Sequence, residues 1–267
     1  MSRPPAAAVS ESLLAFWAEA GIDAALLETP TDRIAEGQRP LAPRAAQPTP
    51  LPAPATSAPA RPLALGAARE AAAACADLDA LAAAIEAFEG CPIRFEGAAS
   101  RSVFCRGPAD APVVVIGEAP GAEEDRAGQP FVGKAGRMLD RMLEAIGLAD
   151  QVFITNTVFW RPPGNRTPTP EEQRVCKPFV EQAIRLVRPR MLLLVGAPAT
   201  RCMLDQTDGI NRLHGRWFEW RTTEADLEVP ALPTFHPAFL MRTPSAKSMA
   251  WSDLKTFAER LNRPSRG

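Results

Sequence analysis

The chain has 267 residues, of which 46% are hydrophobic and 23% charged, and its formal net charge is −1. This length allows one large domain, or one domain with an appended segment. Five cysteines without paired spacing favour a reducing compartment over a disulfide-stabilised secreted scaffold. No apolar run reaches the roughly 18 residues of a membrane span, and the first residues lack a basic-then-apolar signal, so we expect a cytoplasmic protein.

The charge is distributed unevenly along the chain. Residues 1–90 carry six Lys and Arg against eleven Asp and Glu, whereas the remaining residues carry twenty-four against twenty. The net charge of the whole chain therefore hides a mildly basic C-terminal part, which is compatible with an anionic partner.

The N-terminal residues differ in composition from the rest. Residues 1–28 are expected to form a short amphipathic helix in which Leu13, Leu14 and Trp17 share a face. Two interpretations stay open: this helix folds back onto the main domain, or it docks onto another protein through the face around Trp17. Residues 29–64 are rich in proline and alanine and predict a disordered linker, so the main domain is expected over 65–267.

Strands and helices alternate along residues 65–267. The predicted strands are Val113–Gly117, Val152–Thr157, Met191–Gly196 and Leu232–Phe235. The predicted helices are an alanine-rich one from Leu65 to about Phe88, one over Gly136–Gly147, one capped by Thr169 with Glu172 in a capping box, and a last one capped by Ser245. A polar hairpin around Trp217 and Trp220 is expected to leave His214 at the surface. The alternation predicts an α/β fold with three layers, α/β/α, around a central four-stranded parallel sheet.

Three polar side chains follow or end predicted strands. Glu118 follows the first strand, Asn156 lies at the end of the second, and His236 follows the fourth. Ligands of open α/β sheets bind at the carboxyl ends of the strands, so we expect these three side chains to converge. Phe131, from the glycine-rich stretch after the first strand, adds an aromatic surface.

The predicted pocket lacks the residues of several common sites. No serine or cysteine stands beside the histidine, and neither a phosphate-binding lysine motif nor a dinucleotide fingerprint is present. An amide edge, a glycine-lined wall and one aromatic ring suit a planar heterocycle instead. The flanking loops Arg161–Arg166 and Leu240–Arg242 could contact a phosphate backbone.

Four motifs lie along this domain: GEAPGAEEDRAGQPFVGKAGRMLD from Gly117, the strand end ITN, RPPGNRTPTPEE from Arg161 and HPAFLMR from His236. In this order and spacing they resemble the family 4 uracil-DNA glycosylases, over about Phe88–Leu261. The resemblance implies that the chain flips uracil out of DNA and hydrolyses its N-glycosidic bond, in base excision repair. It also implies a uracil-containing DNA partner, action as a monomer, and association with the nucleoid.

Residue roles follow from the resemblance, position by position. Phe131 would stack on uracil, Asn156 would read its polar edge, and Glu124 would lie near C5, where the family excludes the methyl group of thymine. The backbone N–H groups of Glu118 and Ala119 would hold the ring.

The resemblance also implies the catalytic residues and the DNA contacts. His236 would stabilise the negative charge left on uracil O2, and the Glu118 carboxylate would position water or balance the sugar cation. Leu240 and Met241 would fill the gap left by the flipped base. The full set of DNA contacts is Lys134, Arg161, Arg166, Leu240, Met241 and Arg242.

Typical members of the family hold a 4Fe–4S cluster with four cysteines. The matching positions here are Phe88, Cys91, Trp160 and Cys176. We therefore expect no cluster and no metal, with the two aromatic residues filling the space and the two cysteines left as a buried remnant pair. The less favoured alternative is a cluster completed by Cys75 or Cys105.

The sequence is compatible with two functions. The leading one is a monofunctional glycosylase with ordinary turnover. The other is a protein that recognises uracil or abasic DNA with little turnover, an interpretation prompted by the altered cluster positions and the long N-terminal segment.

Overall fold

The computed structural model describes residues 61–263, and side chains from residue 64 onward. All of these residues fall within one unit of the chain, Thr56–Gly267. The predicted N-terminal helix and nearly all of the predicted linker lie outside the described residues. No helix of residues 61–263 has the length and apolar character needed to cross a membrane.

The centre of the fold is a six-stranded sheet with the order β1-β3-β2-β4-β6-β5. Its strands are β1 (Cys105–Arg106), β2 (Val113–Gly117), β3 (Val152–Asn156), β4 (Met191–Val195), β5 (Phe218–Arg221) and β6 (Glu228–Thr234). The four inner strands, β3, β2, β4 and β6, are parallel, as the sequence predicts. Antiparallel edge strands extend this parallel core to six strands, β1 beside β3 and β5 beside β6. The predicted hairpin around Trp217 and Trp220 supplies β5, whereas the prediction missed β1.

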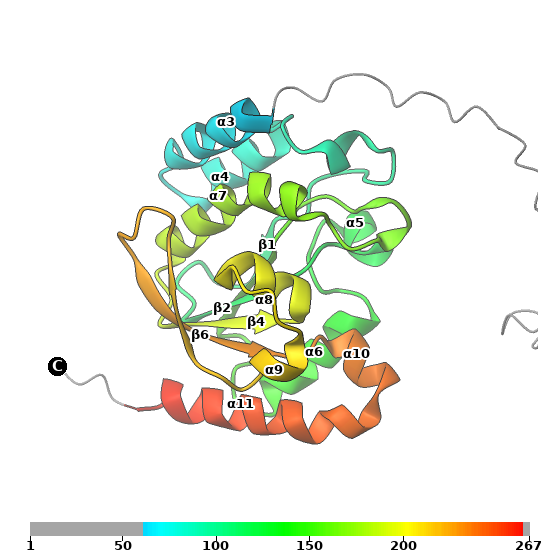
Figure 1. Ribbon diagram of the computed structural model, residues 1–267, viewed down its shortest axis with the longest axis vertical. Helices are drawn as coiled ribbons and strands as arrows, with labels where there is room; N and C mark the ends of the chain where they lie inside the picture. Colours follow the sequence, from blue (N-terminus) through cyan, green and yellow to red (C-terminus); the bar gives the residue numbers. More distant parts are fainter. Residues whose placement is uncertain (1–60, 264–267) are drawn as a thin grey trace, which may run out of the picture. The chain divides into compact units, whose positions relative to one another are not determined.

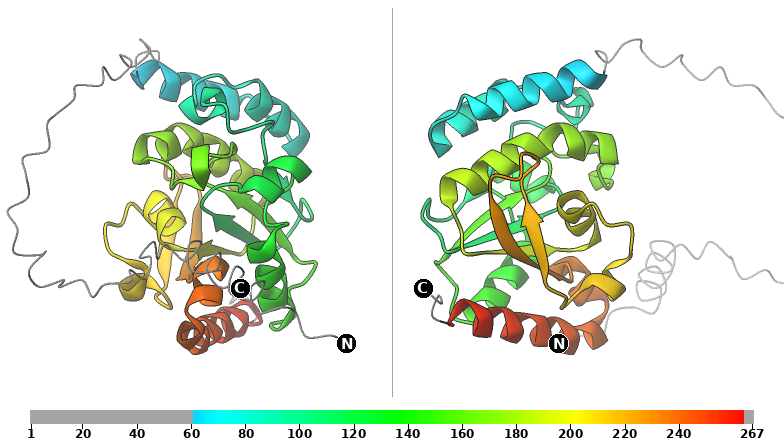
Figure 2. Two further views of the ribbon diagram at one scale, coloured as in Figure 1. Left: turned by 90° about the vertical axis from the view of Figure 1, so that its right-hand side faces the viewer. Right: turned by 60° about the vertical axis from the view of Figure 1, so that its left-hand side comes forward.

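Helices cover both faces of the sheet (Figure 1). They are α3 (Arg61–Ala73), α4 (Leu78–Ala87), α5 (Ala122–Ala127), α6 (Lys134–Glu144), α7 (Pro170–Val187), α8 (Ala197–Leu204), α9 (Ile210–Leu213), α10 (Pro237–Arg242) and α11 (Lys247–Leu261). Short 3-10 turns add Pro92–Phe95, Pro163–Asn165 and Pro244–Ala246. Figure 2 shows α7 against one face, with α3 outside it, and α11 on the other face.

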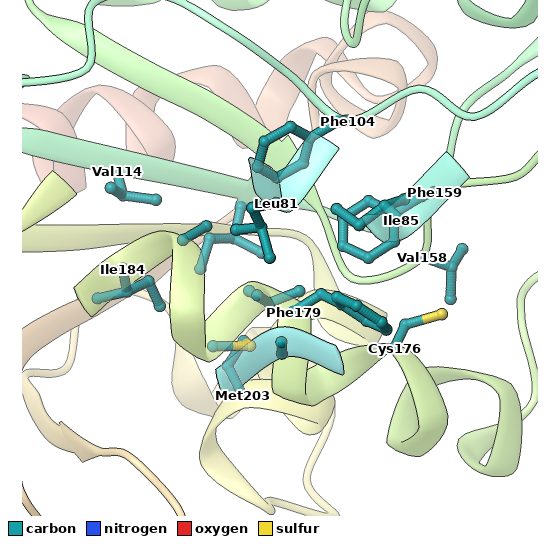
Figure 3. Close-up of a cluster of buried hydrophobic side chains, with 14 of the residues drawn as sticks. Leu81, Ile85, Phe104, Val114, Val158, Phe159, Cys176, Phe179, Ile184 and Met203 are labelled. Carbon is teal, nitrogen blue, oxygen red and sulfur yellow. The ribbon is translucent and has the colours of Figure 1, made fainter. Parts of the chain in front are cut away.

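The buried strands alternate between two hydrophobic cores, because successive side chains of a strand point to opposite faces. Val114 and Ile116 pack with α7, α4 and α3 in one core, which Figure 3 shows in close-up. Val113 and Val115 pack with α6, α10 and α11 in the other. This two-sided burial confirms the three-layer α/β/α prediction.

Several helix boundaries differ from the prediction. The alanine-rich stretch forms two helices, because Asp77 accepts a hydrogen bond from Ala80 N–H and starts α4 anew. The helix α3 begins at Arg61, inside the predicted linker. Ser245 does not cap α11; it lies in a 3-10 turn, and no side chain caps that helix. The predicted capping box of Thr169 and Glu172 at the start of α7 is confirmed.

Candidate active site

The carboxyl ends of the parallel strands bring the predicted pocket residues together. The register of β2 and β3 pairs Gly117 with Asn156. A Cβ atom on Gly117 would lie 2.4 Å from Cζ of Phe131 and 2.5 Å from Oδ1 of Asn156. Both side chains therefore reach the end of β2 only because residue 117 has none of its own.

The ring of Phe131 is fixed from its backbone. Phe131 has a left-handed φ of 55°, which is uncommon for an aromatic residue. The Arg106 side chain, on edge strand β1, donates to the carbonyl oxygens of Pro130 (2.9 Å) and Phe131 (3.3 Å). A Cβ on Gly136 would lie 1.7 Å from the Phe131 carbonyl oxygen, so the loop sits directly on α6.

His236 lies beside Phe131, with ring centroids 5.9 Å apart and planes inclined by 35°. It caps α10, and its Nδ1 accepts a hydrogen bond from Ala238 N–H at 3.2 Å. A backbone N–H can only donate, so Nδ1 carries no proton and the neutral ring carries its proton on Nε2. Burial, with a smaller effect from the charge of Arg242, lowers the His236 pKa to about 4 against an opposing effect of Glu124. At neutral pH the imidazole is therefore an uncharged donor through Nε2.

Asn156 is 1% exposed, and its Oδ1 is buried without a hydrogen-bond partner among the described residues. A buried acceptor without a donor costs about 1–3 kcal/mol. Such a cost at the end of a central strand indicates an acceptor prepared for an N–H group of a ligand.

Glu124 braces the wall of the pocket. Its two carboxylate oxygens accept hydrogen bonds from Gly133 N–H (2.8 Å) and Gly121 N–H (3.1 Å). The carboxylate thus ties the turn after β2 to the loop that carries Phe131. Both oxygens of the Glu124 carboxylate are therefore engaged. The resemblance implies that this same side chain lies near C5 of the base.

The turn after β2 is held from the neighbouring strand. Thr157 Oγ1 donates to the Glu118 carbonyl oxygen at 2.7 Å, and Gln173 Nε2 donates to Thr157 Oγ1 at 2.9 Å. Within residues 61–263, the N–H groups of Glu118 and Ala119 and the Glu118 carboxylate take part in no hydrogen bond. Two backbone donors and one half-buried carboxylate are thus left available to a ligand.

Some of the predicted DNA contacts are exposed, whereas others are buried or already bind another side chain. Lys134, Met241 and Arg242 are exposed. Leu240 is 1% exposed and packs in the second core, so in this structure Met241 and not Leu240 is presented at the surface. It precedes Met241 on α10, and consecutive helical residues point in different directions.

Arg166 is paired with carboxylates. Its guanidinium donates to Glu172 at 2.7 Å and to Glu96 at 2.9 Å, and these contacts raise its pKa. The pairs join the Arg166 loop to α7 and to the Pro92–Phe95 turn. Arg161 donates to Asn165 Oδ1 at 2.8 Å within the same loop and is half-buried.

His214 is not the surface residue that the sequence suggests. Its Nδ1 lies 3.1 Å from Oδ1 of Asp253, a buried residue of α11 that also accepts from Thr234 Oγ1 at 2.9 Å. The His214 ring packs on Phe235, with centroids 4.5 Å apart. This pair fixes the end of β6 just before His236, and no local pattern in the sequence predicts a contact between residues so far apart.

The four cluster positions hold two thiols and two aromatic rings. Phe88 packs edge-on against Phe179 at 5.0 Å and covers Gly90, whose added Cβ would lie 2.4 Å from its ring. Trp160 is 2% exposed. A hydrogen bond to the Cys91 thiol, together with burial, raises the pKa of the Cys176 thiol well above its usual range.

These positions do not fit a 4Fe–4S cluster, which needs four thiolates or a close substitute. In the described part of the chain, no three His, Cys, Asp or Glu side chains are placed to hold a metal ion. Figure 3 shows Cys176 within the hydrophobic core, together with Phe159 and Phe179.

Comparison with known proteins agrees with this geometry. The sequence profile described as "Uracil DNA glycosylase superfamily" matches residues 104–255. The type-4 uracil-DNA glycosylase of Thermotoga maritima is 37% identical over 157 residues, covering 58% of this chain and 78% of that protein. That of Sulfurisphaera tokodaii is 35% identical over 162 residues, covering 58% and 73%, and that of Pyrobaculum aerophilum 37% over 150 residues, covering 54% and 76%. With its strand-end site and this degree of similarity, the chain belongs to the uracil DNA glycosylase superfamily and, within it, to the type-4 uracil-DNA glycosylases.

Proposed function

We propose that this protein is a monofunctional uracil-DNA glycosylase, which flips uracil out of DNA and hydrolyses its N-glycosidic bond to leave an abasic site. The observation that carries the proposal is the buried Oδ1 of Asn156, which has no hydrogen-bond partner among the described residues and lies, like the Phe131 ring, against Gly117. The neutral His236 ring lies 5.9 Å from the Phe131 ring, between centroids. Membership of the family supports the same reaction and substrate.

Base recognition would use the shape and the edge of uracil. The Phe131 ring offers a stacking surface, and the Asn156 carboxamide offers an acceptor and a donor. Uracil presents N3–H and O4, which complement these groups. Cytosine presents an acceptor at N3, which would face Asn156 Oδ1 without a proton between them.

Bond cleavage would use charge stabilisation at two places. As the glycosidic bond breaks, negative charge develops on uracil O2, and the Nε2–H of His236 is a preorganised donor for it. The positive sugar would lie on the side of Glu118, whose carboxylate can orient water or balance the cation. Because His236 is neutral at physiological pH, it would act as a hydrogen-bond donor rather than as a cation.

Glu124 has a different task in this proposal. Its hydrogen bonds to Gly121 and Gly133 fix the wall that would face C5 of the base. Exclusion of thymine would therefore depend on the rigidity of this wall rather than on contact with the carboxylate alone.

The proposed reaction uses no metal and no iron–sulfur cluster. Burial of Phe88 and Trp160 and the raised Cys176 pKa support this part of the proposal. Iron analysis of purified protein should give far less than four iron atoms per chain, and absorbance near 400 nm would contradict the proposal.

The activity is tested with single- and double-stranded oligonucleotides that contain one uracil, without added metal or nucleotide. Excess substrate should be converted to abasic sites over many turnovers. A tight stoichiometric complex without turnover would instead indicate a lesion-binding protein. If neither abasic sites nor a complex form at micromolar protein, the proposed function is wrong.

A further inference from the structure

A basic groove lies on the α7 side of the sheet. It has a volume of about 780 Å³ and runs between α7, α8 and the start of α3. At one end are Thr167 and Pro168, before α7, and Pro198, which follows β4 by three residues. At the other end is Thr223, in the hairpin between β5 and β6. Figure 1 shows α7 and α8 with the sheet behind them.

Hydrogen bonds link the groove to the turn that follows β2. Gln173 lines it and donates to Thr157 Oγ1, which in turn donates to the Glu118 carbonyl oxygen. Two hydrogen bonds therefore separate the floor of the groove from the turn that forms one wall of the base pocket.

The charge of the groove is strongly one-sided. Its lining carries four cations and one carboxylate: Arg69, Arg174, Lys177, Arg201 and Asp205. Lys177 pairs with Asp205 at 3.2 Å, and Arg174 with Glu171, outside the groove, at 2.9 Å.

The other two arginines are less occupied. Arg69 and Arg201 are exposed, and neither forms an ion pair with a described residue. Arg201 only donates a long hydrogen bond, 3.4 Å, to the Asp208 carbonyl oxygen. Cations that line a concavity without carboxylate partners are the arrangement that binds phosphates.

A second hollow marks the far end of this basic surface. It shares Arg69 and Thr223 with the groove, but it is lined by three carboxylates, Glu181, Glu224 and Asp226. Arg185 there is already paired, with Glu224 at 3.0 Å and Asp226 at 2.9 Å. The sign of the charge therefore changes near Thr223, which limits an anionic ligand to the space between that residue and the pocket.

We propose that this groove binds the sugar-phosphate backbone of the DNA strand flanking the flipped nucleotide, with Arg69, Arg174 and Arg201 as phosphate contacts. The proposal rests on the function proposed above and adds a second DNA-binding surface to it. Pro168, Pro170 and Pro198 supply apolar walls against which a sugar or an unstacked base can pack.

The test compares a triple variant, Arg69→Gln, Arg174→Gln and Arg201→Gln, with a charge-matched control. The control is Arg141→Gln, Arg188→Gln and Lys255→Gln, three exposed cations that do not line the groove. The dissociation constant for a long, uracil-free single strand is measured by fluorescence anisotropy over a range of salt concentrations. Uracil excision is measured on a long strand and on a uracil-centred trinucleotide.

The logarithm of the association constant falls as the logarithm of the salt concentration rises. Loss of three phosphate contacts should make this slope shallower by about 2, because each contact to single-stranded DNA contributes about 0.7. The groove variant should raise KM on the long strand and leave kcat/KM on the trinucleotide near the wild-type value, since the short substrate does not reach the groove. The control should retain the wild-type salt slope.

An unchanged slope in the groove variant, or an equal decrease in the control, would overturn the inference. The binding measurement uses no uracil, so it is independent of the proposed reaction. Suppose that wild-type protein excises no uracil but that the groove variant binds DNA with a shallower salt dependence. The proposed glycosylase function would then be wrong, and the proposed DNA-binding groove would be supported. If wild-type protein excises uracil but the groove variant keeps the wild-type salt slope, the function would be supported and the proposed groove would be wrong.

Discussion

The strand-end pocket and the region around Phe88 and Trp160 differ in how completely their polar and apolar groups are satisfied. The pocket keeps an unpartnered Asn156 Oδ1 and a histidine whose pKa is shifted by burial. Around Phe88 and Trp160 the side chains are close-packed and apolar, and the Cys176 thiol is held in its protonated form. One region carries unmet interactions that a ligand can complete, and the other contributes to stability without one. Substitutions should therefore separate activity from stability in opposite ways.

The largest effect is expected from Trp160→Ala. Removal of this buried indole should lower the free energy of unfolding by about 3–5 kcal/mol, since nothing nearby can fill the cavity. Denaturant titration measures the change, and excision below the lowered melting temperature should persist. The control is Trp251→Ala, because Trp251 is 43% exposed and its loss should change stability by about 0.5 kcal/mol or less. An equal loss of stability in the two variants would contradict the stabilising role of the region around Phe88 and Trp160.

His236→Ala should act on the reaction instead. Loss of the Nε2–H donor is expected to lower the single-turnover rate of excision by about 10²–10³-fold, the usual effect of removing one oxyanion donor. His236→Gln, which retains an N–H donor, should lose less. A decrease smaller than about threefold in the alanine variant would remove His236 from the mechanism.

The same histidine predicts a pH dependence of stability. Its folded pKa is about 4, below the unperturbed 6.5, so the unfolded chain takes up the proton first as the pH falls. The stabilising contribution is therefore complete above pH 6.5 and is lost as the pH falls toward 4. Between neutral pH and pH 4 the wild type should lose about 3 kcal/mol more stability than His236→Gln. Parallel stability curves for the two proteins would show that burial does not hold the ring neutral.

Asn156→Ala should give the smallest effect and the clearest contrast with Trp160→Ala. We expect kcat/KM to fall by about ten- to a hundredfold, corresponding to one to two lost hydrogen bonds with the base. Stability should stay constant or rise by about 1 kcal/mol, because the variant removes a buried acceptor without a donor. Asn211→Ala, an exposed asparagine of α9, is the matched control and should change neither quantity. A large destabilisation by Asn156→Ala would mean that its amide is structural.

The convergence of Glu118, Asn156 and His236 was predictable, because parallel strands end at one edge of the sheet. The edge strand β1 was not predictable, because a strand of two residues is too short to show an alternating pattern. The burial of Leu240 was not predictable for a similar reason. The helix α10 has only six residues, too few to fix which side faces the core. The pairing of Arg166 with Glu96 joins residues 70 positions apart, and local sequence patterns do not determine such contacts.

Gly117 gives the pocket an unusual vulnerability. A single methyl group at this position would have to displace a phenyl ring and a carboxamide together, while leaving the hydrogen bonds of β2 available. Recognition here would be abolished by the gain of an atom, not by the loss of a functional group. A protein that had lost its activity in this way would still display every residue expected of the active site, so an inventory of side chains alone would misjudge it.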